Sequence, residues 1–66
     1  MAWKVLAKWP DSAGGRTTAP VNCEDQRDVV GMYRAFSADG EFERVWIEDM
    51  GGKEISPRTF GIEEAS

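Results

Sequence analysis

The chain opens on an alternation of apolar and polar residues, the period of a strand buried on one face. Between Ala2 and Trp9 one face carries Trp3, Val5, Ala7 and Trp9, and the other carries Lys4, Leu6 and Lys8. Pro10 ends this strand, and the glycine-rich residues 11–15 predict a loop. Residues 16–21 favour a second strand that pairs back on the first, with Pro20 at an edge or a strand end, and the sequence leaves open whether it forms.

A helix is expected after Asn22, which has the side chain of a helix N-cap and is followed by acidic residues in the first turn. The apolar stripe of this helix has the i, i+3, i+4, i+7 spacing and consists of Val29, Met32, Tyr33 and Phe36. Gly40 is suited to the left-handed position that ends a helix. Gly31 costs about 1 kcal/mol inside a helix relative to alanine, so it either permits a close approach to the sheet or is simply tolerated.

The second half of the chain predicts a hairpin. Residues 42–49 alternate again and read as a central strand, with Val45 and Ile47 on one face and Phe42, Arg44 and Trp46 on the other. Gly51 and Gly52 allow a turn into a returning strand over 53–56 that directs Ile55 to the core. After Pro57, residues 58–62 form a short segment that docks Phe60 and Ile62, and 63–66 are expected to be a frayed tail.

These elements predict an α+β fold in which one amphipathic helix packs on a small antiparallel sheet of three or four strands. The 66 residues leave room for one domain spanning 1–66. The expected core consists of Val5, Ala7, Val29, Tyr33, Phe36, Val45, Ile47 and Ile55. Because so short a chain buries little surface, self-association or a bound partner is a plausible source of extra stability.

Cysteine content and hydropathy bear on the compartment. Cys23 is the only cysteine, so no disulfide can close within the chain, whereas small secreted domains usually depend on disulfides. No stretch approaches the roughly 20 apolar residues that span a bilayer, and the N-terminal residues do not form an export signal. We therefore expect a cytoplasmic protein without a membrane segment.

The net charge of −4 and the pI near 4.6 disfavour direct binding to phosphate backbones. Acidic side chains that are candidates for one acidic face are Glu41, Glu43, Glu48 and Asp49. None of the carboxylate clusters has the spacing of a calcium loop, and solvated surface charge explains them best. A basic protein would be the natural partner of such a face.

The chain lacks histidine, the commonest general base and metal ligand near neutral pH. A reactive thiol at Cys23 is conceivable beside a helix N-terminus, but Glu24 and Asp25 oppose the thiolate and no partner base is evident. Residues 14–18 lack the glycine-to-lysine spacing of a phosphate-binding loop. We assign no catalytic, cofactor-binding or metal-binding residue, and we expect the protein not to be an enzyme.

The aromatic residues are the most informative surface candidates. If Val45 and Ile47 face the helix, Trp46 points to the opposite face with Phe42, Arg44 and, from a neighbouring strand, Leu6. An uncovered apolar face of this kind marks a protein contact, commonly a homodimer interface. The alternative is that Phe60 and Ile62 fold under the sheet and cover Trp46.

Three functions follow from these features. The first is a non-catalytic protein-interaction module, either an adaptor or a homodimer formed through the Trp46 face. The second is an acidic inhibitor, of the kind found in phages and mobile elements, that occludes a nucleic-acid-handling enzyme by placing carboxylates where phosphates would lie; it requires the acidic groups to share one face. The third is a small-molecule binder that uses Gly14, Gly15 and Arg16, although a pocket of several hundred Å³ is unusual in so short a chain.

Overall fold

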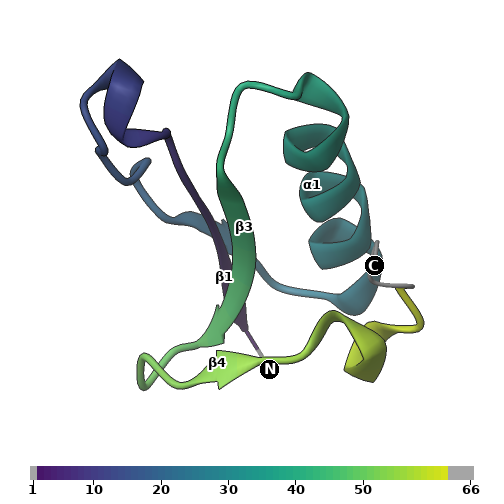
Figure 1. Cartoon of the computed structure of the whole chain (residues 1–66). Coiled ribbons are helices and arrows are strands. Elements are labelled where there is room, and N and C mark those ends of the chain that lie inside the picture. The colour runs from purple at the N-terminus through teal and green to yellow at the C-terminus, as the bar shows by residue number, and fades with distance from the viewer. Residues whose placement is uncertain (1, 63–66) are drawn as a thin grey trace.

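In the computed structural model, which describes residues 2–62, one helix lies across one face of a four-stranded antiparallel sheet (Figure 1). The elements in chain order are β1 (Trp3–Lys8), the 3-10 helix η1 (Asp11–Ala13), β2 (Val21–Cys23), α1 (Gln26–Asp39), β3 (Arg44–Asp49), β4 (Glu54–Ile55) and the 3-10 helix η2 (Pro57–Phe60). The strand order is β2-β1-β3-β4, so β1 and β3 are central. The predicted α+β architecture is confirmed. The tail expected over 63–66 lies outside the described residues.

Strand β1 follows the predicted alternation. Val5 and Ala7 are fully buried, and Val5 belongs to the core cluster beneath α1. Leu6 points to the other face, where the antiparallel register with β3 sets it opposite Trp46. Because side chains alternate along a strand, one short segment supplies both the core and the opposite face of the sheet.

The second strand exists, but it begins later than the sequence indicated. Val21 pairs with Val5, whereas the first contact back to β1 is an isolated bridge between Thr17 and Lys8. Thr17 and Val21 are four positions apart, whereas their partners Lys8 and Val5 are three positions apart. The chain between Thr17 and Val21 therefore holds one extra residue, as in a bulge. Pro20, which has no N–H to give to a ladder, lies in this irregular stretch.

The N-cap of the helix lies three residues after the predicted one. Asp25 is the N-cap, and its Oδ1 accepts a 2.9 Å hydrogen bond from the backbone N–H of Asp28. The assignment of the cap to Asn22 was wrong because Asn22 pairs with Lys4 as part of β2. Gly40 ends the helix in the left-handed conformation, with φ of 73°, as predicted.

Gly31 does not lie against the sheet. It is exposed, and a Cβ built at this position would meet no heavy atom within 4 Å. The expectation that this glycine permits a close approach was therefore wrong. The observed surroundings agree with a glycine that the helix merely tolerates.

Strand β3 and β4 form the predicted hairpin, with Ile47 opposite Ile55. The Asp49 carboxylate organises the turn by accepting hydrogen bonds from the backbone N–H groups of Gly51 and Lys53, each at 2.9 Å. Gly52 has a φ of 89°, which favours glycine. β3 begins at Arg44, so Phe42 lies before the strand instead of inside it.

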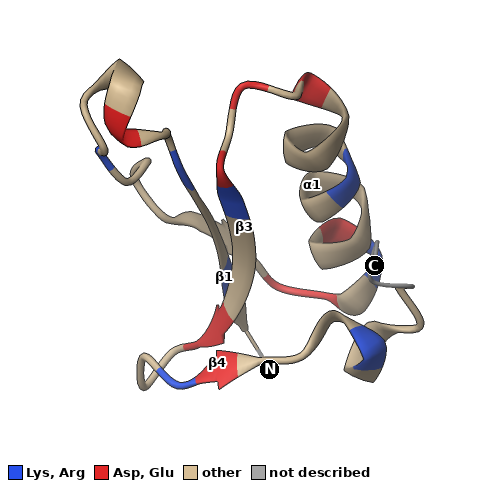
Figure 2. Ribbon diagram, in the orientation of Figure 1, with Lys and Arg blue, Asp and Glu red and all other residues tan. Residues whose placement is uncertain are grey.

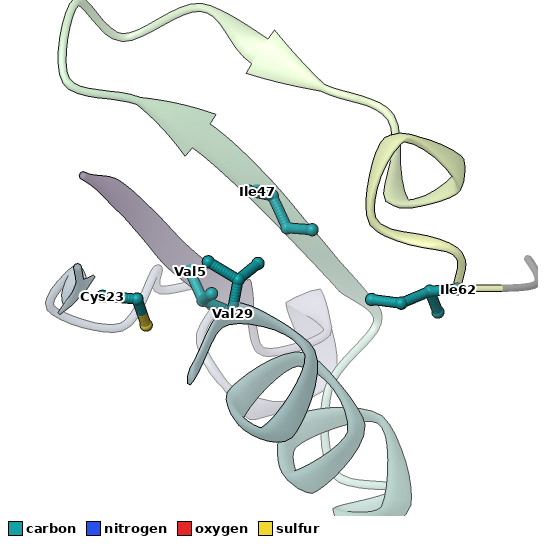
Figure 3. Packing of buried hydrophobic residues seen from close by; sticks show 5 residues of the cluster. All are labelled: Val5, Cys23, Val29, Ile47 and Ile62. Atoms are coloured by element: carbon teal, nitrogen blue, oxygen red, sulfur yellow. The ribbon is translucent and has the colours of Figure 1, made fainter. Parts of the chain in front are cut away.

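The core lies between the sheet and α1, and it is closed at one end by η2. Figure 3 shows its most buried side chains, which are Val5, Cys23, Val29, Ile47 and Ile62. The partly buried Tyr33, Phe36, Val45 and Ile55 pack against them, as the sequence predicted. Phe60 meets Trp3 edge to face at 5.3 Å between ring centroids, so the predicted docking of Phe60 and Ile62 is confirmed. No helix within residues 2–62 has the length and apolarity needed to cross a membrane.

Candidate protein-contact face

The face of the sheet opposite α1 carries a central Trp46, with charged side chains on both sides. We call it the open sheet face; in the strands it consists of Lys4, Leu6, Lys8, Asn22, Arg44, Trp46, Glu48 and Glu54. The β1–β3 register sets Lys4 opposite Glu48, Leu6 opposite Trp46 and Lys8 opposite Arg44. Directly opposed side chains in an antiparallel pair lie close enough to interact, so this register builds one continuous surface.

The indole ring of Trp46 is held by two neighbours on its own strand. Its Nε1–H donates a 2.7 Å hydrogen bond to Oε2 of Glu48, and the Arg44 guanidinium carbon lies 4.8 Å from the ring centroid. Both partners are two residues away, which places all three side chains on the same face. A cation over the ring and an acceptor for its N–H together restrict the rotation of a half-buried tryptophan.

Ion pairs link the charged residues of the open sheet face. Lys4 Nζ lies 3.8 Å from Glu48 Oε1, and Lys8 Nζ lies 3.3 Å from Glu43 Oε2. Arg44 pairs with Glu54 across the hairpin. The pairs of Lys8 and Arg44 are open to solvent and contribute at most about 1 kcal/mol each to stability, whereas the Lys4–Glu48 pair is half-buried.

The structure decides against the alternative in which Phe60 and Ile62 cover Trp46. Ile62 is buried in the cluster beneath α1, and Phe60 packs on Trp3 of that same cluster. In the described part of the chain both side chains therefore lie across the sheet from Trp46. Contacts with the core between the sheet and α1 therefore hold η2 in place.

Phe42 is also placed differently from the prediction. Its ring lies 5.3 Å from Phe36 of α1 and 5.2 Å from Trp9, measured between centroids. These contacts put Phe42 on the helix side, because the period-two pattern holds only inside the strand that starts at Arg44. Of the four contact candidates, the fold brings together Leu6, Arg44 and Trp46.

The open sheet face is less apolar than the sequence suggested. Leu6 retains only 8% of its accessible surface, and Trp46 is half-buried. Within residues 2–62 the one large hydrophobic side chain that is mostly exposed is Met50, at 57%, in the β3–β4 turn. Sequence reasoning also missed Glu48 as a partner of Trp46, although its i, i+2 spacing carried the signal.

The acidic candidates lie at two separate ends of β3. Glu41 and Glu43 precede the strand, whereas Glu48 and Asp49 end it, and the five residue-to-residue steps from Glu43 to Glu48 span about 16 Å at the strand rise. Glu43 and Glu48 pair with lysines, and Asp49 is bound in the turn. Figure 2 shows that acidic and basic residues occur along the ribbon at both ends of the molecule.

Cys23 is 3% exposed and lies in the core cluster. Burial raises the pKa of its thiol above the ordinary value, and the carboxylates of Asp28 and Asp25 raise it further. Its Sγ lies 3.8 Å from the carbonyl oxygen of Val21, toward which the thiol donates. Such surroundings hold the sulfur as an inert thiol. Among the described residues no group of three or more His, Cys, Asp or Glu side chains is arranged to hold a metal ion.

Comparisons with known proteins add no information about the fold or the open sheet face. No family model, no curated protein and no solved structure matches the chain. The open sheet face and the distribution of charge are therefore the features of the molecule that bear on its function.

Proposed function

We propose that the protein is a non-catalytic interaction module that binds another protein through the open sheet face, and that a second copy of the chain is its partner. The observation that carries this proposal is the position of Trp46. It lies at the centre of the face that α1 and η2 leave free, and its ring is ordered by Arg44 and Glu48.

An ordered tryptophan is well suited to a binding hot spot. Tryptophan is enriched among the residues that dominate binding energy, usually near the centre of an interface. A side chain already held in place loses less conformational entropy when a partner covers it. Replacing the water above the Trp46 ring with a partner surface would therefore stabilise a complex at small ordering cost.

The charges around Trp46 favour a second copy as the partner. On the open sheet face Lys4, Lys8 and Arg44 supply three cations and Glu48 and Glu54 supply two anions, while Glu43, which precedes β3, pairs with Lys8. A two-fold axis sets the same patch against itself, so a face that carries both signs can meet its copy with opposite charges in contact. The small apolar area predicts weak association, in the range of transient complexes.

Light scattering coupled to size-exclusion chromatography tests self-association at high micromolar concentration. The wild type is expected to show a mass that rises above the monomer with concentration. Trp46→Ala and Arg44→Ala should remain monomeric, whereas Met50→Ala, which alters the exposed turn residue, should behave as the wild type. Arg44 is exposed, so its variant tests the face with little effect on folding. Equal, strictly monomeric masses for the wild type and Trp46→Ala would contradict the homodimer.

A heterologous partner is tested separately, by capture with immobilised protein and identification of the bound proteins by mass spectrometry. The wild type is compared with Trp46→Ala and Met50→Ala. A partner retained by the wild type and by Met50→Ala, but lost with Trp46→Ala, would support an adaptor instead of a homodimer. A partner that binds all three equally would place the interaction elsewhere on the chain.

The acidic-inhibitor alternative requires carboxylates gathered on one face. Its four candidates are divided between the two ends of β3, and lysines neutralise Glu43 and Glu48. This interleaving of charge favours the interaction module over a nucleic-acid mimic. If immobilised protein captured a basic nucleic-acid-handling enzyme, the acidic inhibitor would be favoured over the interaction module.

A further inference from the structure

An open hollow of about 670 Å³ shares no lining residue with the open sheet face, and it is lined by Trp9, Ala13, Gly14, Arg16 and Glu41. Its volume falls within the range of small-molecule sites, roughly 300–1,000 Å³. The lining comes from three segments: the residue that follows β1, η1 with the loop after it, and the connection between α1 and β3. In Figure 1 the η1 loop and the connection after α1 lie at the same end of the molecule.

The hollow is built from fixed parts. The ring of Trp9 packs on Phe42 at 5.2 Å, and its backbone N–H donates a 2.8 Å hydrogen bond to the carbonyl oxygen of Arg16. The loop is fastened by hydrogen bonds to the carbonyl oxygen of Pro10 from the N–H groups of Ala13, at 2.8 Å, and Gly15, at 3.0 Å. The ring of Trp9 and the backbone of Arg16, from which the guanidinium extends, are thus set in place before any ligand arrives.

The charged groups of this hollow are one guanidinium and one carboxylate. Arg16 and Glu41 are both exposed, and within residues 2–62 neither makes an ion pair with the other or with a third residue. By contrast, Lys4, Lys8 and Arg44 are all paired. Two opposite charges that line one hollow without closing on each other leave room for a group that carries both signs.

The charge balance also selects among ligand classes. A nucleotide carries net negative charge, which one cation offset by one anion on a protein of net charge −4 does not attract. A zwitterion has no net charge and satisfies both groups at once. The indole of Trp9 adds a flat apolar surface on which a planar ring can stack.

We propose that this hollow binds a small zwitterion with a planar apolar body, of which an aromatic amino acid is the simplest example. The ligand carboxylate meets Arg16, the ammonium meets Glu41 and the ring lies on Trp9. The site is independent of self-association through the open sheet face. Because it is shallow and exposed, its affinity is expected in the millimolar range.

Amide and indole NMR correlation spectra of isotope-labelled protein test this site with L-phenylalanine as the probe. Saturable shifts are expected at the Trp9 indole and the Gly14 amide, with the Trp46 indole unchanged. Phenylpropionate, which lacks the ammonium, and phenethylamine, which lacks the carboxylate, should each bind more weakly. Arg16→Gln and Glu41→Gln should each weaken binding about two- to fivefold, as expected from losing one exposed ion pair.

Arg34→Gln, an exposed arginine on α1, is the matched control and should leave the affinity unchanged. Three results would overturn the proposal. They are the absence of saturable shifts at tens of millimolar L-phenylalanine, binding of either one-charge probe as tight as that of L-phenylalanine, and preferential binding of a nucleoside monophosphate. The substituted side chains are exposed, so unchanged shifts elsewhere in each spectrum will show that the variants fold.

Discussion

Leu6 and Trp46 lie directly opposite each other on the face of the sheet that α1 leaves open, and Leu6 retains only 8% of its accessible surface. A leucine on an uncovered face is normally more exposed. The β1–β3 register sets the large apolar ring of Trp46 against Leu6. Arg44 and Glu48 hold this ring in place. Trp46 therefore contributes to folding stability as well as to the proposed interface.

Replacing Trp46 with alanine should lower the free energy of unfolding by about 2 kcal/mol, because Leu6 loses its cover and a cross-strand pair is removed. Trp46→Phe keeps an aromatic ring in the pair and should cost less. Urea denaturation followed by circular dichroism measures both. Equal stability of Trp46→Ala and the wild type would mean that the ring does not shield Leu6.

Replacing Gly31 with alanine should raise the free energy of unfolding by about 0.5–1 kcal/mol, since the helix gains propensity and the new methyl group meets no neighbour. The control is Gly40→Ala, where the left-handed φ of 73° makes any side chain unfavourable and a loss of stability is expected. Thermal melting of the two variants compares them directly. A lower melting temperature for Gly31→Ala would show a constraint at this position.

Replacing Asp25 with alanine should cost about 1 kcal/mol, because the backbone N–H of Asp28 loses the carboxylate that caps the helix. Asp25→Asn retains an acceptor oxygen and should recover most of that loss. Asn22→Ala, at the position that the sequence alone favoured for the cap, should change stability by less. Chemical denaturation of the three variants ranks them, and a larger loss at Asn22 would contradict the observed start of α1.

Cys23 should make the protein less stable in alkaline solution. An unfolded thiol ionises near its usual pKa of about 8.5, whereas the folded pKa is raised by burial and by Asp28 and Asp25. Above the unfolded pKa the unfolded chain binds fewer protons than the folded one, so the free energy of unfolding falls as pH rises toward the folded pKa. Below the unfolded pKa this contribution is fully present.

Urea denaturation of the wild type and Cys23→Ala between neutral and strongly alkaline pH measures the effect. The difference in stability between the two proteins should shrink as pH increases, by at most about 1.4 kcal/mol per pH unit. A constant difference across that range would mean that the thiol ionises equally in both states. Slow reaction of Cys23 with a thiol reagent in the folded protein is the kinetic counterpart.

The sequence by itself determined the elements whose signal is local. Alternation over residues 2–9 and 42–49 marked the two central strands, and the stripe from Val29 to Phe36 marked the helix with its buried side. Gly40 ended the helix as expected. These features depend on side-chain periodicity and on the backbone freedom of one residue, so neighbours in the chain suffice to predict them.

Only the tertiary structure decided between locally equal alternatives. Asn22 and Asp25 are both good caps, and the pairing of β2 with β1 removed Asn22 from the helix. Phe42, Phe60 and Ile62 were directed to the helix side of the sheet by packing partners far away in the chain, such as Trp9 for Phe42 and Trp3 for Phe60. The hollow between Arg16 and Glu41 joins segments that no motif connects. Such choices depend on which long-range contacts bury most apolar surface, and the period of a short segment does not contain that information.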